Sequence, residues 1–344
     1  MVDPNFMDNI VKQVEFLSYL DGNWPCPPAG FSLFWMFNDH AAESAISGFR
    51  AISGFRLVSW IFLLAAMPWN SSPAQLFLPP PVHEEPGPSK RVFVTSPEYV
   101  GTSVHHMLYL PLDWQEEDRE GWPVIVEFTG NRYPRSGSTG KVEDAGLGYG
   151  IGGGKFIWVT LPFVGRDGEN AVTWWGDAAA TVRYAKATIP QICARYGGDP
   201  NKVLLCGFSR GAIAVNYIGL HDDEIAKLWA GFITHDHYDG VREWGGTAWG
   251  TPLNQYRDGA KRRLSRLQGR PVLVCQAGDT VDIRQYLQSR ADLGAVTFLD
   301  VPVRAIFPSF PNSVAIHPHT DRWLLIPSPA RLSVRAWVER VLDL

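Results

Sequence analysis

The stretch Lys202-Val-Leu-Leu-Cys-Gly-Phe-Ser209-Arg-Gly-Ala-Ile-Ala-Val-Asn-Tyr-Ile218 decides the fold of this chain. Its apolar run 203–206 is typical of a central parallel strand, because both faces of such a strand are covered. The next five residues, 207–211, have the pattern G-x-S-x-G and lead into a helix of small residues. The two glycines leave no Cβ atoms beside Ser209, which permits a sharp turn. The stretch therefore predicts a buried strand, a turn that lifts one serine hydroxyl above the sheet edge, and a helix.

Composition places the chain among globular proteins and argues against a polyanionic partner. Of its 344 residues, 45% are hydrophobic and 19% are charged, and the formal net charge of −4 implies no polyanionic partner such as a nucleic acid. The four cysteines, Cys26, Cys193, Cys206 and Cys275, have no metal-ligand spacing. Neither a metal nor a cofactor is expected.

The N-terminal part differs from the rest of the chain. Residues 45–50 are repeated without change as 51–56, which indicates a recent duplication rather than a folding repeat. The apolar segment 57–67 follows basic residues and precedes a small-residue stretch that ends near Ala74, as in a signal peptide. Eleven residues are too few to span a bilayer, which takes about 20. We therefore expect export to the periplasm or the exterior, with no stable membrane span in the mature chain.

This pattern divides the chain into three regions. Residues 1–74 form an over-extended N-terminus, with Met36 a candidate initiator and a signal-peptide-like segment at about 50–74; a core helix or a membrane anchor is the alternative. Residues 75–90 are expected to be a proline-rich linker. Residues 91–344 form the folded domain.

Apolar runs alternate with helical patterns along that domain. The first two runs alternate in polarity as antiparallel edge strands do, whereas the later ones are short and apolar. The expected strands are 91–95, 103–110, 123–128, 156–161, 203–206, 228–234, 270–275 and 296–303, and long helices are expected from 174–177 to about Tyr196 and over 329–344. This order predicts an α/β protein with a doubly wound, mostly parallel sheet and helices on both faces. The glycine-rich loop within 146–154 has no G-K-[S/T] after it, so no nucleotide site is expected.

A serine hydroxyl is a poor nucleophile until a base takes its proton, and a carboxylate must orient that base. A serine, an aspartate and a histidine occur here in that chain order, each after a strand. In this order, and in its G-x-S-x-G turn, the chain resembles the α/β-hydrolase superfamily over residues 91–344. Within it, the strings at 207–212 and 319–323 are similar to those of secreted bacterial esterase-like proteins. The chain departs from the commoner esterase pattern in having Phe-Thr-Gly-Asn at 128–131 where His-Gly is usual.

The acid and the base each leave a choice. Asp279 lies about three residues past the strand 271–276, where the loop is expected to deliver it, whereas Asp282 is also placed to cap a helix. Asp279 is the preferred acid and Asp282 the alternative. His319 is preferred as the base over His317, because the proline after His317 restricts its backbone.

Two backbone N–H groups are expected to form an oxyanion hole. That of Arg210 lies at a helix N-terminus, and the resemblance implies that of Asn131, after the strand 123–128. The side chains expected to line the pocket are Trp174, Trp175, His235 and His237. A metal site from His235, Asp236, His237 and Asp239 is not expected, because their spacing does not bring them onto one ion.

The resemblance implies a secreted serine hydrolase that cleaves a carboxylic ester through an acyl-enzyme, with an acylated polysaccharide as a candidate substrate. Acyl transfer is common to esters and amides, so a serine peptidase or amidase of the same fold is the alternative. A catalytically inactive binding protein on this scaffold is a further one, because fold does not determine function.

Overall fold

The computed structural model describes residues 74–116, 121–173, 176–242, 253–288, 295–307 and 317–344. The chain divides into two compact units, 1–70 and 71–344. The signal-peptide-like segment up to residue 73 lies outside the described residues, and the described helices and strands all belong to the second unit.

A sheet with the strand order β1-β2-β3-β5-β4-β8-β9-β10-β11 forms the centre of this unit. Strand β3 is antiparallel to β2 and β5, and the strands from β5 through to β11 are parallel. Its strands are β1 (Pro81–Val82), β2 (Arg91–Val94), β3 (His106–Tyr109), β4 (Trp122–Phe128), β5 (Ile157–Leu161), β8 (Gly198–Phe208), β9 (Gly231–His235), β10 (Val272–Ala277) and β11 (Val296–Val301). A small antiparallel pair joins β6 (Phe163–Val164) to β7 (Asn170–Ala171).

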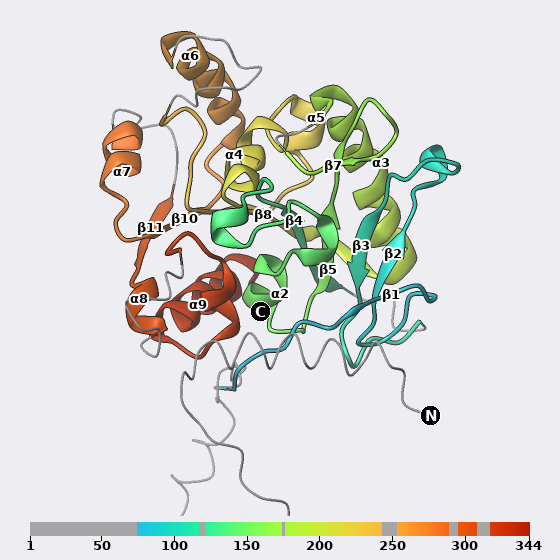
Figure 1. Ribbon diagram of the computed structural model, residues 1–344. Coiled ribbons are helices and arrows are strands. Elements are labelled where there is room, and N and C mark those ends of the chain that lie inside the picture. The colour runs from blue at the N-terminus through green and yellow to red at the C-terminus, as the bar shows by residue number, and fades with distance from the viewer. Residues whose placement is uncertain (1–73, 117–120, 174–175, 243–252, 289–294, 308–316) are drawn as a thin grey trace, which may run out of the picture. The chain divides into compact units, whose positions relative to one another are not determined.

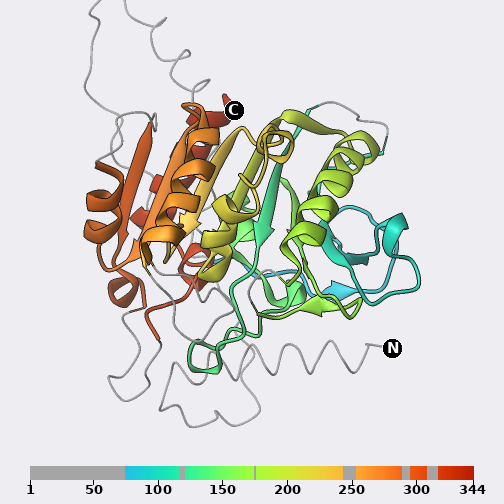
Figure 2. The same ribbon diagram turned by 90° about the horizontal axis from the view of Figure 1, so that it is seen from above.

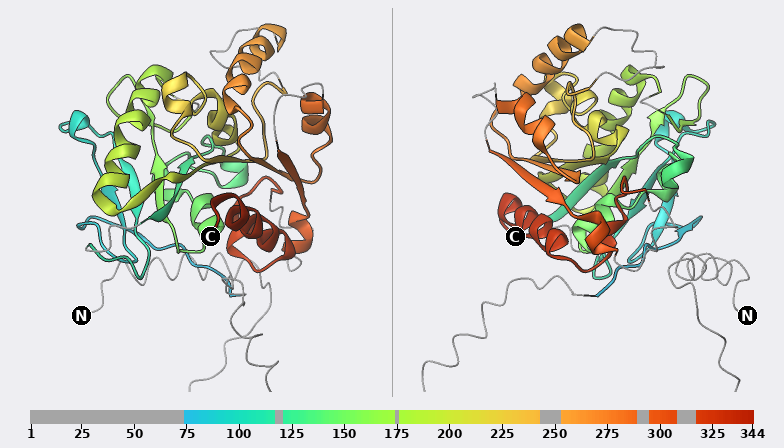
Figure 3. Two further views of the ribbon diagram at one scale, coloured as in Figure 1. Left: turned by 180° about the vertical axis from the view of Figure 1, so that it is seen from behind. Right: turned by 60° about the vertical axis from the view of Figure 1, so that its left-hand side comes forward.

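Helices cover both faces of the sheet. They are α2 (Leu147–Gly152), α3 (Ala178–Tyr196), α4 (Arg210–Tyr217), α5 (Asp223–Ala226), α6 (Leu253–Leu264), α7 (Val281–Gln288), α8 (Val303–Ile306) and α9 (Pro329–Leu342). Short 3-10 turns are η1 (Pro97–Tyr99), η2 (Pro134–Ser136), η3 (Val142–Asp144), η4 (Ser265–Leu267) and η5 (Arg322–Leu325). In Figure 1, α3 to α6 lie above the sheet and α2 and α9 below it. Figure 2 shows the layer formed by α3 and α4 from above, and Figure 3 shows α6 and α9 on opposite faces.

The apolar runs of the central strands pack on both sides. On β4, Val124, Val126 and Phe128 belong to the core beneath α3 and α4, while Ile125 belongs to the core beneath α2 and α9. Strand β8 alternates in the same way, because successive side chains of a strand point to opposite faces. An uninterrupted apolar run is therefore needed at these strands, which confirms the predicted doubly wound sheet. This sheet, with the serine turn between β8 and α4, is the α/β-hydrolase fold.

The long helices begin and end as the sequence predicts. The Asp177 side chain caps α3 by accepting from the Ala180 N–H at 3.0 Å, and Gly197 ends the helix in the left-handed region. The Ser328 side chain caps α9 in the same manner. None of the helices in the described ranges is long and apolar enough to cross a membrane.

Two segments differ from expectation. The start of 75–90 is docked on the domain rather than forming a linker: β1 pairs with β2, the Leu76 N–H donates to the Leu325 carbonyl, and buried Arg331 donates to that of Ala74. The glycine-rich stretch forms helix α2, not a loop. A Cβ at Gly148 would overlap the Trp158 ring, so glycine is needed there for close packing.

Candidate active site

Ser209 lies in the turn between β8 and α4, with φ 56° and ψ −119°, an unusual conformation for a residue other than glycine. Its backbone N–H donates to the His235 carbonyl at 2.9 Å, which ties the turn to the neighbouring strand. A Cβ at Gly207 would overlap the Gly211 carbonyl oxygen, and one at Gly211 would overlap that of Phe128. The steric need for both glycines is thus confirmed.

His319 reaches Ser209 from the segment that precedes α9. Its Nε2 lies 2.7 Å from the Ser209 Oγ, and its ring packs against Phe208 at a centroid distance of 4.7 Å. His317 accepts the His319 backbone N–H at 3.3 Å and packs edge-on against Tyr133. The structure therefore places His319, and not the alternative His317, against the serine.

Asp236 occupies the position beside the other nitrogen of this histidine. Its Oδ2 lies 2.9 Å from His319 Nδ1, and its side chain is buried at 1% exposure. Its Oδ1 accepts the Ala277 N–H at 2.6 Å. Burial opposes ionisation, but the nearby His235, the His319 contact and the Ala277 N–H outweigh it and hold the pKa of Asp236 below its usual value. An ionised carboxylate therefore faces His319.

The predictions of Asp279 as the acid and of Asp282 as its alternative are wrong, because the structure places neither carboxylate beside His319. Asp279 is exposed and accepts the Val281 N–H at 3.1 Å, while Asp282 forms an ion pair with Arg242 at 2.8 Å. The reason is the strand order: β9 lies between β8 and β10, so the end of β9 is closer to the serine than the end of β10. Sequence reasoning missed Asp236 as the carboxylate beside His319, although its position directly after the strand that follows the serine helix was a usable signal.

Contrary to expectation, His235 is not among the described lining residues of the cavity beside Ser209. Its side chain is fully buried at the end of β9, with Nε2 2.9 Å from the Thr320 carbonyl oxygen and 2.9 Å from the Trp323 indole nitrogen. Nε2 either donates to the carbonyl or accepts from the indole. In both tautomers the ring bonds the end of β9, next to Asp236, to the segment that carries His319.

Asp239 joins the same loop to α6. Its buried carboxylate accepts two hydrogen bonds from Arg263, at 2.7 and 3.0 Å, and one from the Tyr256 hydroxyl at 2.6 Å. That hydroxyl accepts the Gly240 N–H at 2.8 Å. The Asp239 carboxylate thus bonds to Arg263 and Tyr256, whereas that of Asp236 contacts His319 and accepts from Ala277.

A cavity of about 370 Å³ opens beside the serine. Its described lining residues are Asn131, Arg132, Tyr133, Ser209, Arg210, His237, His317 and His319. The two predicted oxyanion residues, Asn131 and Arg210, thus lie beside Ser209. A Cβ at Gly130 would come within 3.1 Å of that of Ser209, which shows how closely the turn after β4 approaches.

His237 is the predicted pocket residue that the structure places in this lining. Its ring lies 5.2 Å from that of His319. Burial, together with the proximity of His319 and Arg210, lowers the pKa of His237 well below its usual value, so its imidazole is neutral at neutral pH. The other two predicted pocket residues, Trp174 and Trp175, lie outside the described residues.

Glu127 lies beneath the site with its carboxylate buried. It accepts hydrogen bonds from the N–H groups of Leu147 (3.3 Å) and Gly148 (2.8 Å) and from the Trp158 indole (2.9 Å). Burial and the nearby Asp321 raise its pKa to about 7. Glu127 thus attaches the start of α2 to β4, next to the turn that approaches Ser209.

Comparisons with known proteins give likenesses of structure only. No protein-family profile matches the chain, and no curated protein does. Among solved structures it is similar to a thermostable esterase at 16% identity and a TM-score of 0.44, over 73% of this chain and 62% of that one. It is similar to a butyrate-bound esterase from Thermogutta terrifontis at 16% identity and a TM-score of 0.38, over 60% and 84% of the two chains. A ferulic acid esterase matches at 13% identity and a TM-score of 0.41, over 69% and 92%. The first match spans less than two thirds of that esterase, and these likenesses assign no activity to the present chain.

Proposed function

We propose that this protein is a serine hydrolase that cleaves carboxylic esters, with Ser209 as nucleophile, His319 as base and Asp236 as acid. One observation carries the proposal. His319 contacts both other residues, with Nε2 2.7 Å from Ser209 Oγ and Nδ1 2.9 Å from Asp236 Oδ2. A buried carboxylate at Nδ1 keeps the proton on that nitrogen, which leaves Nε2 free to accept the serine proton.

The geometry supports a two-step acyl transfer. His319 takes the Ser209 proton while Oγ attacks the ester carbonyl carbon, and the N–H groups of Arg210 and Asn131 are the proposed donors to the resulting oxyanion. His319 then gives the proton to the leaving alcohol, and the acyl group stays on Ser209. Water attacks this acyl-enzyme with His319 again as the base, which releases the acid and restores the serine.

We also propose export and a polymeric substrate, each from a different feature. The signal-peptide-like pattern at about 50–74 supports export. Tyr133 and His317 lie edge to face, 5.6 Å between ring centroids, in the lining of the serine cavity. Aromatic surfaces of this kind pack against sugar rings, which supports an acylated polysaccharide as substrate.

The test is hydrolysis of short-chain 4-nitrophenyl esters, acetylated xylan and aminoacyl anilides, with a fluorophosphonate probe to report the nucleophile. The esters are expected to be cleaved, and intact mass is expected to show one probe on the protein. Ser209→Ala should remove the label and lower kcat by about 10⁴-fold or more. Labelling or most of the activity retained by the folded variant would overturn the mechanism. Cleavage of anilides alone would instead favour an amidase.

A further inference from the structure

We propose that the preferred ester carries a carboxylate close to its scissile bond and that Arg132 binds this carboxylate. The proposal rests on the proposed function and names the substrate class of the same site. It commits to a carboxylate because a planar guanidinium pairs with one through two parallel hydrogen bonds.

The charged side chains among the described lining residues of the serine cavity are both positive. Arg132 and Arg210 line it, and none of its described lining residues is an aspartate or a glutamate. Burial lowers the pKa of Arg210 only to about 10, so this side chain is a cation at neutral pH.

Several carboxylates lie close to this cavity without lining it: Glu127, Asp144 and Asp321 line a separate cavity that also contains His319. Asp236 lies beneath the site and contacts His319. Asp279 and Asp282 line a neighbouring cavity that shares only His237 with this one among their described lining residues. Asp282 is paired there with Arg242. Arg132 itself forms no ion pair with a carboxylate in the part of the chain that the structure describes.

The backbone around Arg132 is held in place, which makes its position specific. Its N–H donates to the Val172 carbonyl at 2.7 Å, and the next N–H, of Tyr133, donates to the Ser138 carbonyl at 2.8 Å. Arg132 directly follows Asn131, the proposed oxyanion donor. A carboxylate close to the ester carbonyl is therefore within reach of the Arg132 side chain. This arrangement selects esters that bear the charge on the acyl or the alcohol part, close to the scissile bond.

Two matched pairs of esters test the proposal and separate the two parts of the substrate. For the acyl part, the 4-nitrophenyl ester of succinate is compared with that of methyl succinate. For the alcohol part, 4-acetoxybenzoate is compared with its methyl ester. In at least one of the two pairs, the charged ester should have a kcat/KM about ten-fold higher than that of its methyl ester. This is the range expected of one charge-assisted contact. This preference should shrink as the salt concentration rises from about 0.01 to 1 M, because salt screens exposed charges.

Arg132→Gln should lower the ratio of charged to neutral kcat/KM about ten-fold, through KM. Arg135→Gln is the matched control, because Arg135 is exposed on the same loop but does not line the cavity; it should keep the ratio of the unmodified protein. Equal kcat/KM within both pairs, or a preference that survives Arg132→Gln, would overturn the proposal and leave the proposed function standing. If none of these four esters and none of the short-chain 4-nitrophenyl esters is cleaved, both this proposal and the proposed function are overturned.

Discussion

Asp236 adopts a φ of 67°, in the left-handed region that aspartate tolerates better than most residues. Its backbone N–H donates to the Cys275 carbonyl at 3.0 Å, and its Oδ1 accepts from Ala277, so both ends of the residue are bonded to β10. This double attachment leaves Oδ2 facing His319. Asp279 has no comparable attachment, being exposed in the turn before α7.

Asp236→Asn is therefore expected to lower kcat strongly while leaving the fold intact. Asparagine can keep the oxygen that accepts from Ala277, but its amide then faces His319 Nδ1 and favours the wrong tautomer. The expected loss in kcat is about 10⁴-fold. Asp279→Asn, the matched control, should stay within about three-fold, because it loses only an exposed local contact. Steady-state kinetics on a 4-nitrophenyl ester measures kcat of both variants. A large loss of kcat in Asp279→Asn with a small one in Asp236→Asn would restore Asp279 as the acid.

At the scale of elements, a buried carboxyl group helps to attach helix α2 to the sheet. The carboxylate of Glu127 receives donors from Leu147 and Gly148 at the start of the helix and from Trp158 on β5. Its pKa, raised to about 7 by burial and by Asp321, means that the folded protein holds this proton more tightly than the unfolded chain does. The stability that the proton contributes is complete below pH 4.5 and is lost as the pH rises through 7.

Glu127→Gln should remove this dependence, because the amide resembles the protonated acid. Between about pH 4.5 and 7.5 the unmodified protein should lose about 3 kcal/mol of unfolding free energy relative to the variant. Urea unfolding followed by circular dichroism at several pH values measures the difference. Parallel curves for the two proteins would show that Glu127 is ionised throughout this range.

Helix α6 is attached to the loop that carries Asp236. Arg263 makes the link through its paired hydrogen bonds to the buried Asp239. Breaking this contact leaves a buried charge without its partner, so Arg263→Met should cost about 3–5 kcal/mol of stability. It should also lower kcat, because the loop loses the contact that holds it.

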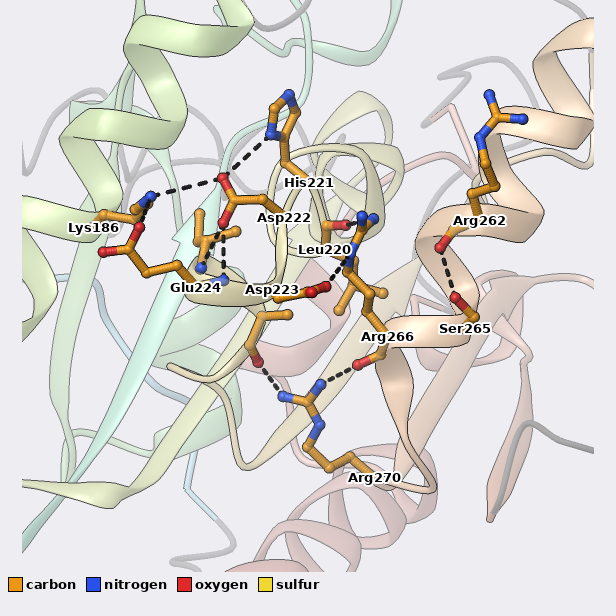
Figure 4. Close-up of polar contacts among 12 residues, drawn as sticks. Lys186, Leu220, His221, Asp222, Asp223, Glu224, Arg262, Ser265, Arg266 and Arg270 are labelled. Carbon is orange, nitrogen blue, oxygen red and sulfur yellow. Dashed lines mark hydrogen bonds and ion pairs between the residues drawn. The ribbon is translucent and has the colours of Figure 1, made fainter.

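Arg266, on η4 directly after α6, provides a matched control. It contacts the exposed Asp223 at 2.6 Å, within a group of surface contacts that also includes Lys186 and Asp222 (Figure 4). Exposed pairs contribute little, so Arg266→Met should cost about 1 kcal/mol and leave kcat unchanged. Equal effects of the two arginine variants on kcat would show that the Asp239 contact does not position the loop.

At the scale of the whole molecule, residues 71–344 form a compact unit of their own. We expect a chain that begins at residue 71 to fold and to keep the full proposed ester-hydrolysing activity. A chain that begins at Arg91 should be less stable, because it loses the pairing of β1 with β2 and the bonds that Ala74 and Leu76 make near α9. Thermal unfolding and kcat/KM of both chains test this. Equal melting temperatures would show that 75–90 contributes nothing to the fold.

The sequence by itself determined the sheet class, the serine turn and the histidine that meets it. These depend on short-range features: apolar runs that require two covered faces, glycines that permit close approach, and a proline that restricts its neighbour. The segment 202–218 needs no distant residue to specify strand, turn and helix. His319 could be predicted for a similar reason, because the proline after His317 argued against that alternative base.

Only the tertiary structure decided which aspartate serves His319, what His235 does and where 75–90 lies. The choice between Asp236 and Asp279 depends on the order of β8, β9 and β10 across the sheet, which joins segments far apart along the chain. His235 reads in the sequence as a polar residue at a strand end, and its bonds to Thr320 and Trp323 exist only after the last loop has packed. Residue type limits which chemistry a site can perform, but contacts between distant segments select the atoms that perform it.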